Sequence, residues 1–404
     1  MSAKLRVSLA SVQAARTTLN EYVRPSPLLE NPWLSEAFGC RVYLKLENMH
    51  PIGSFKIRGA TYRISQLNAA QRKKGVIAAS AGNHAQGVAW GARALGVNAL
   101  IVMPKNASLI KAQNTKALGA EVRLEGEDFD EAMQIAKKIA RKTGRTLIHA
   151  FEDEAIISGQ GTLGLELIEQ LPDVDYVFGS VGGGGMLAGV STVLKELSPR
   201  VVIVGCQAKG ADSMVRSIKK GRAIKLGRID TFADGIAIKQ ASESVRRILA
   251  KRVDHFVSED DESIAWAVLM LLEKAKVAAE GSGAVPLASL ERFRSRVRGK
   301  KVVLIVSGGN IDVNILARIL DRGLTRAGRK IRIDARISDR PGSLARLTGA
   351  IAETGASVIQ VIHDRAEPAT HLNETGVALT LETRGPEHSR RVIEAIRKFV
   401  VGFT

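Results

Sequence analysis

Short apolar segments alternate with amphipathic segments along most of the chain, and this alternation limits the possible folds more than any other feature of the sequence. Apolar runs of about four to eight residues, bounded by turn residues, are typical of β-strands that are buried on both faces. We therefore predict strands at residues 76–80, 99–103, 121–124, 146–149, 176–180, 201–207 and 301–307.

The segments between these strands carry apolar residues at helical spacing. They predict helices at residues 85–95, 108–118, 129–143, 159–170 and 264–279. Buried strands that are separated by helices form parallel sheets with helices on either side. The sequence therefore predicts an α/β fold, in which ligands bind in the crevice at the carboxyl ends of the strands.

The pattern changes after residue 320. Residues 321–330 are polar and basic and contain glycine, which is typical of a linker. In the remaining segment, 331–404, the order strand, helix, strand, strand, helix with a short tail predicts a ferredoxin-like domain (βαββαβ). We thus expect one domain at 1–320, a linker at 321–330 and a second domain at 331–404.

The charge balance raises the question of a nucleic-acid partner. The 59 Lys and Arg residues exceed the 41 Asp and Glu residues, so that the net charge is +18. However, the basic residues form small groups, of which only the one around Phe293 has an aromatic neighbour, and a nucleic-acid groove needs several stacking rings. We expect solvated basic faces and no nucleic-acid partner.

Three further features concern the compartment. The longest apolar run, 264–272, is too short for the about 20 residues that a membrane span requires. The N-terminal residues lack the pattern of a secretory signal, and two cysteines, Cys40 and Cys206, cannot form a disulfide framework. The sequence therefore predicts a cytoplasmic protein without a membrane partner.

A lysine stands near the start of one predicted helix. In residues 53–60 (GSFKIRGA), Ser54 is a good N-cap, which would place Lys56 in the first turn. The helix dipole and burial both lower the pKa of such a lysine. Lys56 is therefore a candidate neutral amine for a Schiff base, with an ordinary surface lysine as the alternative.

Residues 182–185 are four consecutive glycines between the predicted strand 176–180 and a helix that we expect to begin near residue 186. Main-chain N–H groups of such a loop converge on an anion at a helix N-terminus. A dinucleotide site would also need an acidic residue after the next strand, where this chain has Gln207. The predicted cradle for a single phosphate ester consists of Gly182, Gly183, Gly184, Gly185 and Met186.

Two more loops follow predicted strands. Asn83 can donate to or accept from a ligand oxygen, whereas for His84 we favour a structural role over that of a general base. Ser307 is either a partner for a heteroaromatic nitrogen or a helix cap. The first loop suits a carboxylate, and its residues are Ser80, Ala81, Gly82, Asn83 and His84.

A reactive lysine, a phosphate cradle and polar groups for a ring oxygen and a ring nitrogen describe a site for pyridoxal phosphate. The chain resembles the threonine dehydratases (threonine ammonia-lyases), which are fold-type-II pyridoxal-phosphate enzymes. The C-terminal segment around 339–344 resembles an ACT regulatory domain. The first resemblance extends over about residues 11–320 and rests on motifs at 45–48, 53–60, 80–86, 159–162, 182–185, 233–235 and 307–310.

This resemblance implies two parallel-sheet lobes, the smaller one near residues 50–150, and a role for each candidate residue. Lys56 would carry the cofactor with Phe55 packed near the ring, Asn83 would contact the phenolic oxygen, and Ser307 the pyridine nitrogen. The glycine loop with Met186 would hold the phosphate, and residues 80–84 would hold the substrate carboxylate. No metal is expected, because metal-binding relatives have ligands where this chain has Gln207, Ala211 and Ser213.

The implied reaction converts L-threonine to 2-oxobutanoate and ammonia, with L-serine as a second substrate and Lys56 as the general base. A serine racemase of the same family is one alternative, but racemisation needs an acid where this chain has Ala81. A nicotinamide-dependent oxidoreductase and a non-catalytic amino-acid sensor are alternatives from other classes.

The second domain is expected to regulate the first. Its turn leads into a helix whose free N–H groups could receive the carboxylate of an amino-acid effector, with isoleucine or valine as the first choice. ACT modules usually pair, which implies a homo-oligomer, a dimer or tetramer; a purely structural dimerisation module is the alternative. The predicted regulatory residues are Asp339, Arg340, Gly342, Ser343 and Leu344.

Overall fold

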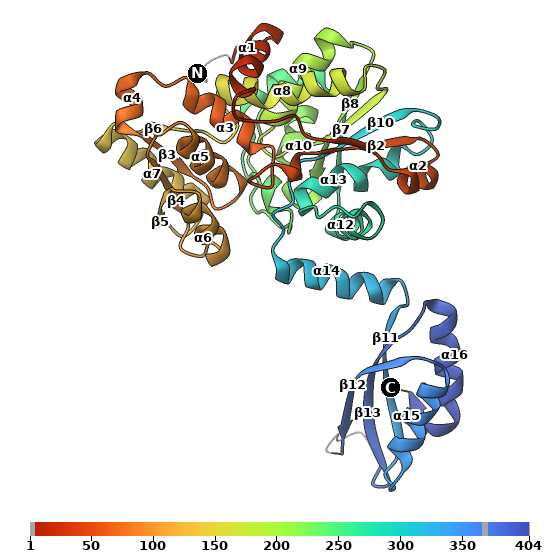
Figure 1. Ribbon diagram of the computed structural model, residues 1–404. Helices are drawn as coiled ribbons and strands as arrows, with labels where there is room; N and C mark the ends of the chain where they lie inside the picture. The colour runs from red at the N-terminus through yellow and green to blue at the C-terminus, as the bar shows by residue number, and fades with distance from the viewer. Residues whose placement is uncertain (1–4, 366–370, 404) are drawn as a thin grey trace. The chain divides into compact units, whose positions relative to one another are not determined.

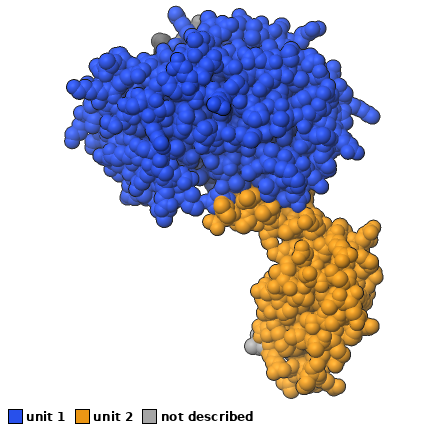
Figure 2. All heavy atoms as spheres, in the orientation of Figure 1, with its two compact units in different colours: residues 1–312 blue, residues 313–404 orange. Residues whose placement is uncertain are grey.

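The computed structural model describes residues 5–365 and 371–403. The chain divides into two compact units, Met1–Asp312 and Val313–Thr404, which Figure 2 colours separately. Residues 366–370 and 404 of the expected second domain, like residues 1–4 of the N-terminal segment, lie outside the described residues. None of the described helices is both long and apolar enough to cross a membrane.

The larger sheet of the first unit has six strands, and all of its neighbouring pairs except that of the edge strand β1 are parallel. The sequence predicted β7, β8 and β10 to within one residue. It missed β2 because Arg41 and Lys45 interrupt the apolar pattern, although Lys45 is buried. In spatial order the strands are β1 (Leu28–Glu30), β2 (Arg41–Leu46), β10 (Lys301–Val306), β7 (Tyr176–Ser180), β8 (Val202–Ala208) and β9 (His255–Glu259).

The smaller sheet has four parallel strands, and its two central strands, β3 and β4, are buried along their whole length. This burial on both faces is what the continuous apolar runs predicted. All four strands lie where the sequence placed them, with β6 shorter than expected. In spatial order they are β5 (Glu121–Leu124), β4 (Ala99–Met103), β3 (Val76–Ala79) and β6 (Thr146–Leu147).

Helices pack around both sheets (Figure 1). The five predicted helices correspond to α5, α6, α7, α8 and α12, and α8 begins earlier than expected because the Asp153 carboxylate caps it. The helices of the first unit are α1 (Leu9–Leu19), α2 (Pro32–Phe38), α3 (Lys56–Ser65), α4 (Ala69–Lys74), α5 (Asn83–Ala94), α6 (Leu109–Ala117), α7 (Phe129–Thr143), α8 (Glu154–Gln170), α9 (Gly185–Leu197), α10 (Ser213–Lys220), α11 (Glu243–Arg252), α12 (Asp261–Ala275) and α13 (Gly281–Leu290).

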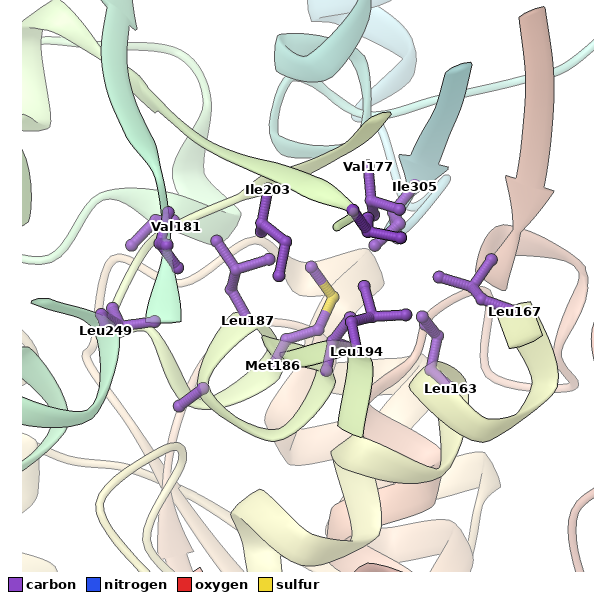
Figure 3. Close-up of a cluster of buried hydrophobic side chains, with 14 of the residues drawn as sticks. Leu163, Leu167, Val177, Val181, Met186, Leu187, Leu194, Ile203, Leu249 and Ile305 are labelled. Atoms are coloured by element: carbon purple, nitrogen blue, oxygen red, sulfur yellow. The ribbon is translucent and has the colours of Figure 1, made fainter. Parts of the chain in front are cut away.

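The main apolar core lies between the larger sheet and the helices α8 and α9 (Figure 3). The two helices approach each other closely at Gly189, where a Cβ atom would lie 2.3 Å from the Ile157 carbonyl oxygen. This contact, together with the core between the helices and the larger sheet, fixes the start of α9 at the glycine loop. Core residues seen in Figure 3 are Leu163, Leu167, Val177, Met186, Leu187, Leu194, Ile203 and Ile305.

The second unit contains the expected order βαββαβ. Its strands form one sheet in the order β12-β13-β11-β14, in which every neighbouring pair is antiparallel. Its elements are α14 (Val313–Arg326), β11 (Lys330–Ser338), α15 (Ser343–Glu353), β12 (Ser357–Asp364), β13 (Glu374–Glu382), α16 (Pro386–Ile396) and β14 (Gly402–Phe403).

The segment between the units differs from the expected linker. Helix α14 includes the first six residues of the stretch 321–330, and the division between the units falls after Asp312 rather than near residue 320. The polar composition of this stretch misled the prediction, because a helix that buries only Ile319 needs little apolar sequence.

Candidate active site

One cavity of about 670 Å³ in the first unit brings together all candidate residues of the four motifs. They come from the loops after β3, β7 and β10 and from the start of α3, which agrees with a site at the carboxyl ends of parallel strands. A second hollow, of about 860 Å³ beside α11, contains none of them. The predicted residues that line the cavity are Phe55, Lys56, Ser80, Ala81, Gly82, Asn83, His84, Gly182, Gly183, Gly184, Gly185, Met186 and Ser307.

Lys56 is the first residue of α3, but the predicted cap is wrong. The N-cap position is Phe55, and the Ser54 hydroxyl is buried without a hydrogen-bond partner among the described residues. Ser54 forms a β-bridge with Gly308, and the Phe55 N–H donates to the Ser307 carbonyl oxygen at 3.1 Å. This main-chain pairing, rather than a side-chain cap, ties the start of α3 to the end of β10.

Arg58 anchors the same turn of α3 on the side away from the cavity, because residues two apart on a helix do not face each other. Its guanidinium donates to the Glu47 carboxylate at 2.7 and 2.8 Å and to the Glu166 carboxylate at 2.6 and 2.9 Å. Lys45 adds a further bond to Glu166 at 2.6 Å, and the side chains of all four residues are at most 2% exposed. These buried ion pairs hold α3 in place.

The Lys56 amine lies inside the cavity wall. Its Nζ atom donates to the Ala150 carbonyl oxygen at 3.1 Å and lies 5.1 Å from the centre of the Phe55 ring. Burial lowers the pKa of Lys56 from its usual value to about 8, although the Glu280 carboxylate acts in the opposite direction. Near neutral pH a minor fraction of this amine is therefore neutral, and this fraction is larger than for an ordinary lysine.

The glycine loop packs so closely that side chains do not fit. Gly184 has a φ of +86°, which L-residues rarely adopt, and a Cβ atom at Gly183 would lie 2.2 Å from the Phe151 ring. Helix α9 begins at Gly185, the last residue of the loop, and its first N–H groups have no partner within the helix. The side chain of Met186 belongs to the core (Figure 3), so that only its main chain is left for a ligand.

A second helix N-terminus borders the same cavity. Helix α5 begins at Asn83 after Gly82, which makes no side-chain cap bond. Burial lowers the pKa of His84 to about 3, and its neutral ring lies 2.9 Å from the Ile148 carbonyl oxygen, to which Nε2–H donates. The imidazole is therefore a structural anchor, which agrees with the preferred prediction. The cavity thus offers two positions for anions, at α5 and α9.

Ser307 is 1% exposed at the end of β10. Its hydroxyl donates to the Ser282 carbonyl oxygen at 3.3 Å and accepts from the Ser180 hydroxyl at 3.1 Å. The helix that follows, α14, begins only at Val313. The alternative that Ser307 is a helix cap is therefore wrong.

Several residues of the cavity wall were not among the predicted site residues. Glu280 is a buried carboxylate, Phe151 supports the glycine loop, and Lys111 forms an ion pair with Asp234 at the cavity. They stand in segments without a recognisable spacing, and only Asp234 belongs to a motif that the sequence singled out. Across residues 5–365 and 371–403, no three His, Cys, Asp or Glu side chains form a cluster that could hold a metal ion.

Comparison with known proteins identifies the class. Residues 19–308 match the family model "Pyridoxal-phosphate dependent enzyme". The match covers more than half of the chain and includes every residue of the cavity discussed above. The chain therefore belongs to this family, and its first unit has the α/β architecture of the fold-type-II enzymes.

Similarity to individual proteins gives more detail than the family model. The chain is 45% identical over 386 residues to an L-threonine ammonia-lyase of Thermotoga maritima, which covers 96% of each chain. It is similar in structure to the processed threonine deaminase isoform 2 of Solanum lycopersicum, with a TM-score of 0.75, 35% identity and coverage of 80% and 91%. It is also similar to maize serine racemase, with a TM-score of 0.74, 33% identity and coverage of 79% and 98%.

The residues of the cavity fit pyridoxal phosphate. The side-chain-free loop at α9 leaves main-chain N–H groups for a phosphate, and Ser307 offers a neutral hydroxyl for a ring nitrogen. Lys56 supplies a largely desolvated amine, and the N-terminus of α5 remains for the carboxylate of an amino acid. The donor set matches the cofactor's phosphate, ring and aldehyde in chemical type.

The lowered pKa of Lys56 predicts unusual reactivity toward amine reagents. In cofactor-free protein, acetylation of Lys56 should reach half of its maximal rate near pH 8, because only the neutral amine reacts. A solvent-exposed lysine should do so near its ordinary pKa of about 10.4. Peptide mass spectrometry across a pH series measures both, and addition of pyridoxal phosphate should protect Lys56. A midpoint for Lys56 at or above pH 10 would contradict the described burial.

Proposed function

We propose that the protein is a threonine ammonia-lyase that converts L-threonine to 2-oxobutanoate and ammonia, and that L-serine is a second substrate. The observation that carries this proposal is the 45% identity to the Thermotoga enzyme, which extends over 96% of both chains. The family membership sets aside the nicotinamide-dependent oxidoreductase and the non-catalytic sensor.

Different residues of the cavity bind different parts of the cofactor and the substrate. The N–H groups of Gly182–Gly185 and Met186 at α9 hold the cofactor phosphate, while Ser307 bonds the pyridine nitrogen. Asn83 contacts the phenolic oxygen, and Phe55 packs near the ring. The loop of Ser80, Ala81, Gly82, Asn83 and His84 receives the substrate carboxylate at the N-terminus of α5, which is supported by the position of all these residues along one cavity.

Lys56 is the residue that we assign to the removal of the substrate Cα proton. Pyridoxal phosphate, when bound, supplies an electron-withdrawing ring that stabilises negative charge at the substrate Cα. Lys56 Nζ removes the Cα proton as general base, and its lowered pKa keeps part of the amine neutral for this step. The fraction of neutral amine increases as the pH rises through about 8. Ser307, as a neutral hydroxyl, does not add a negative charge beside the ring nitrogen.

The reaction itself is tested with purified protein and pyridoxal phosphate. We expect 2-oxobutanoate and ammonia in equal amounts from L-threonine. Lys56→Ala should lower turnover by about 10²- to 10⁴-fold or more, since it removes the base as well as the attachment point of the cofactor. Circular dichroism should show that the fold is retained, because alanine is a good helix former. No 2-oxobutanoate from the wild-type protein, or near-normal turnover by the variant, would refute the proposal.

The likeness to maize serine racemase makes racemisation the second reaction to consider. Ala81 lines the cavity, and its methyl group cannot donate a proton to the opposite face of the substrate. The wild-type protein should therefore eliminate without racemising. Ala81→Ser introduces a hydroxyl and should produce measurable D-serine from L-serine on a chiral column. Equal amounts of D-serine from both proteins would contradict the role assigned to this position.

We propose that the second unit is an ACT-type regulatory domain. Gly342, with a φ of +83°, precedes α15, and Leu344 packs against the core of the unit. The Asp339 carboxylate pairs with Arg365 at 2.9 Å. The Ser343 N–H already donates to the Arg340 carbonyl oxygen, so later N–H groups of the first turn are the ones that we assign to the carboxylate of the effector.

The edge strand β12 supports the proposal of a homo-oligomer. All eight of its residues are exposed, and Val358, Ile359 and Ile362 are 41%, 55% and 49% exposed. An exposed apolar edge of this kind favours pairing with another strand. We assign β12 of a second chain as the partner strand. The two strands would be antiparallel, because Asp364 then faces Ser357, whereas in a parallel pair it would face the like charge of another Asp364.

Removal of the second unit tests regulation and assembly together. A chain that ends at Asp312 should keep its activity, since the family match ends at residue 308. Isoleucine or valine should change the apparent threonine affinity of the full-length enzyme by about 5- to 150-fold and leave the truncated enzyme unaffected. Sedimentation should show a smaller assembly for the truncated form. An equal response of both forms, or none from either, would remove the regulatory assignment.

The protein is further proposed to act in the cytoplasm without a nucleic-acid or membrane partner. Both cysteines, Cys40 and Cys206, are free and buried, which suits a reducing compartment.

A further inference from the structure

Glu280 is a buried carboxylate in the cavity wall to which the proposed reaction assigns no role. It is only 4% exposed and lies at the N-cap position of α13 without a side-chain cap bond. Burial of a carboxylate costs free energy unless hydrogen-bond donors compensate for the lost water. The donors that surround Glu280 therefore indicate what the carboxylate does.

Two glycines provide the space for this carboxylate. A Cβ atom at Gly308 would lie 2.6 Å from Glu280 Oε1, and a Cβ atom at Gly235 would lie 3.0 Å from the same oxygen. The two glycines belong to different motifs, 307–310 and 233–235. A side chain at Gly308 would therefore collide with Glu280, and one at Gly235 would crowd it, so that both glycines leave room for this carboxylate in the cavity wall.

The side chain of Asn83 is held between an acceptor, the Glu280 carboxylate, and a donor, the Asn310 amide. Asn83 Nδ2 donates to Glu280 Oε1 at 2.7 Å, and the Ser282 hydroxyl donates to the same oxygen. On the other side, Asn310 Nδ2 donates to the Ile52 carbonyl oxygen at 2.8 Å and to Asn83 Oδ1 at 2.7 Å. Because a carbonyl and a carboxylate cannot donate, both amides have only one orientation that satisfies the chain.

We propose that Glu280 is a positioning residue that fixes Asn83 as a hydrogen-bond donor toward the ligand in the cavity. The Asn83 amide has two N–H bonds, of which Glu280 takes one, and Asn310 occupies its oxygen. The second N–H bond is the group that remains for a ligand oxygen. The sequence left open whether Asn83 donates or accepts, and this network selects donation, which suits an oxygen with negative charge.

This inference rests on the proposed contact between Asn83 and the cofactor. A double-mutant cycle distinguishes that contact from the positioning of Asn83 by Glu280. We would measure the dissociation constant of pyridoxal phosphate and kcat/KM for threonine in Glu280→Leu, Asn83→Ala and the double variant. If Glu280 acts through Asn83, Glu280→Leu should weaken cofactor binding by about 10- to 100-fold in the wild-type background. In the Asn83→Ala background, the same substitution should cost less than about threefold.

Glu280→Gln tests the acceptor without a drastic change of shape. Glutamine keeps an oxygen that can accept from Asn83 and Ser282 but carries no charge, so its loss should be smaller than that of Glu280→Leu. This variant also keeps the test valid where Glu280→Leu fails to fold. Glu259→Gln is the matched control, because Glu259 is equally buried at 4% and does not line the cavity. It should leave cofactor binding unchanged.

Three results of these experiments would overturn the inference. Equal losses from Glu280→Leu in both backgrounds would overturn the positioning role, since the carboxylate would then act independently of Asn83. A loss in Glu259→Gln as large as in Glu280→Gln would show a general effect of buried charge and would also overturn it. If Asn83→Ala alone leaves cofactor binding unchanged, the proposed contact of Asn83 fails, and the inference about Glu280 fails with it.

Discussion

The buried ion pairs of Arg58 with Glu47 and Glu166 are the interaction on which the geometry of the cavity depends. Arg58 lies on α3, Glu47 directly follows β2 and Glu166 lies on α8, so one guanidinium joins three separate elements. Removal of one partner from such a buried pair costs about 3–5 kcal/mol, because the other charge stays without compensation. Since Lys56 begins the same helix, the network also determines where the amine enters the cavity. Close contact between Gly59 and Gly159 strengthens this arrangement, as a Cβ atom at Gly159 would lie 2.7 Å from the Gly59 Cα atom.

Near Lys56, the positive charge that can bind anionic ligand groups comes largely from main-chain N–H groups. The N-termini of α5 and α9 border one cavity, and each offers N–H groups to an anion. Ser307 and His84 add no charge to the cavity. The charged side chains that line it are those of Lys56, Lys111, Asp128, Asp130, Asp234, Lys239 and Glu280. Burial lowers the pKa of Lys56 and raises that of Glu280. The cavity thus presents two helix N-termini to anionic groups, and the lowered pKa of Lys56 leaves part of its amine neutral.

Much of the fold follows from local patterns in the sequence, whereas parts of the site do not. The strands β3, β4, β7, β8 and β10 were predictable because their apolar runs are continuous, and the candidate residues other than Phe55 and Lys56 follow β3, β7 and β10. Strand β2 was not, because the charge of Lys45 is compensated by Glu166, a residue far away in the sequence. The Ser54 cap failed for a similar reason, since the β-bridge to Gly308 competes with it. Glu280 gave no signal at all, because only the folded chain brings it to Asn83.

We propose that Lys56, among the lysines of this chain, attaches the cofactor. Borohydride reduction of the holoenzyme makes this linkage permanent, and peptide mass spectrometry then locates the pyridoxyl group. We expect one modified peptide, which contains Lys56. Modification of Lys111, which also lines the cavity, or of any other lysine in its place would show that Lys56 does not attach the cofactor.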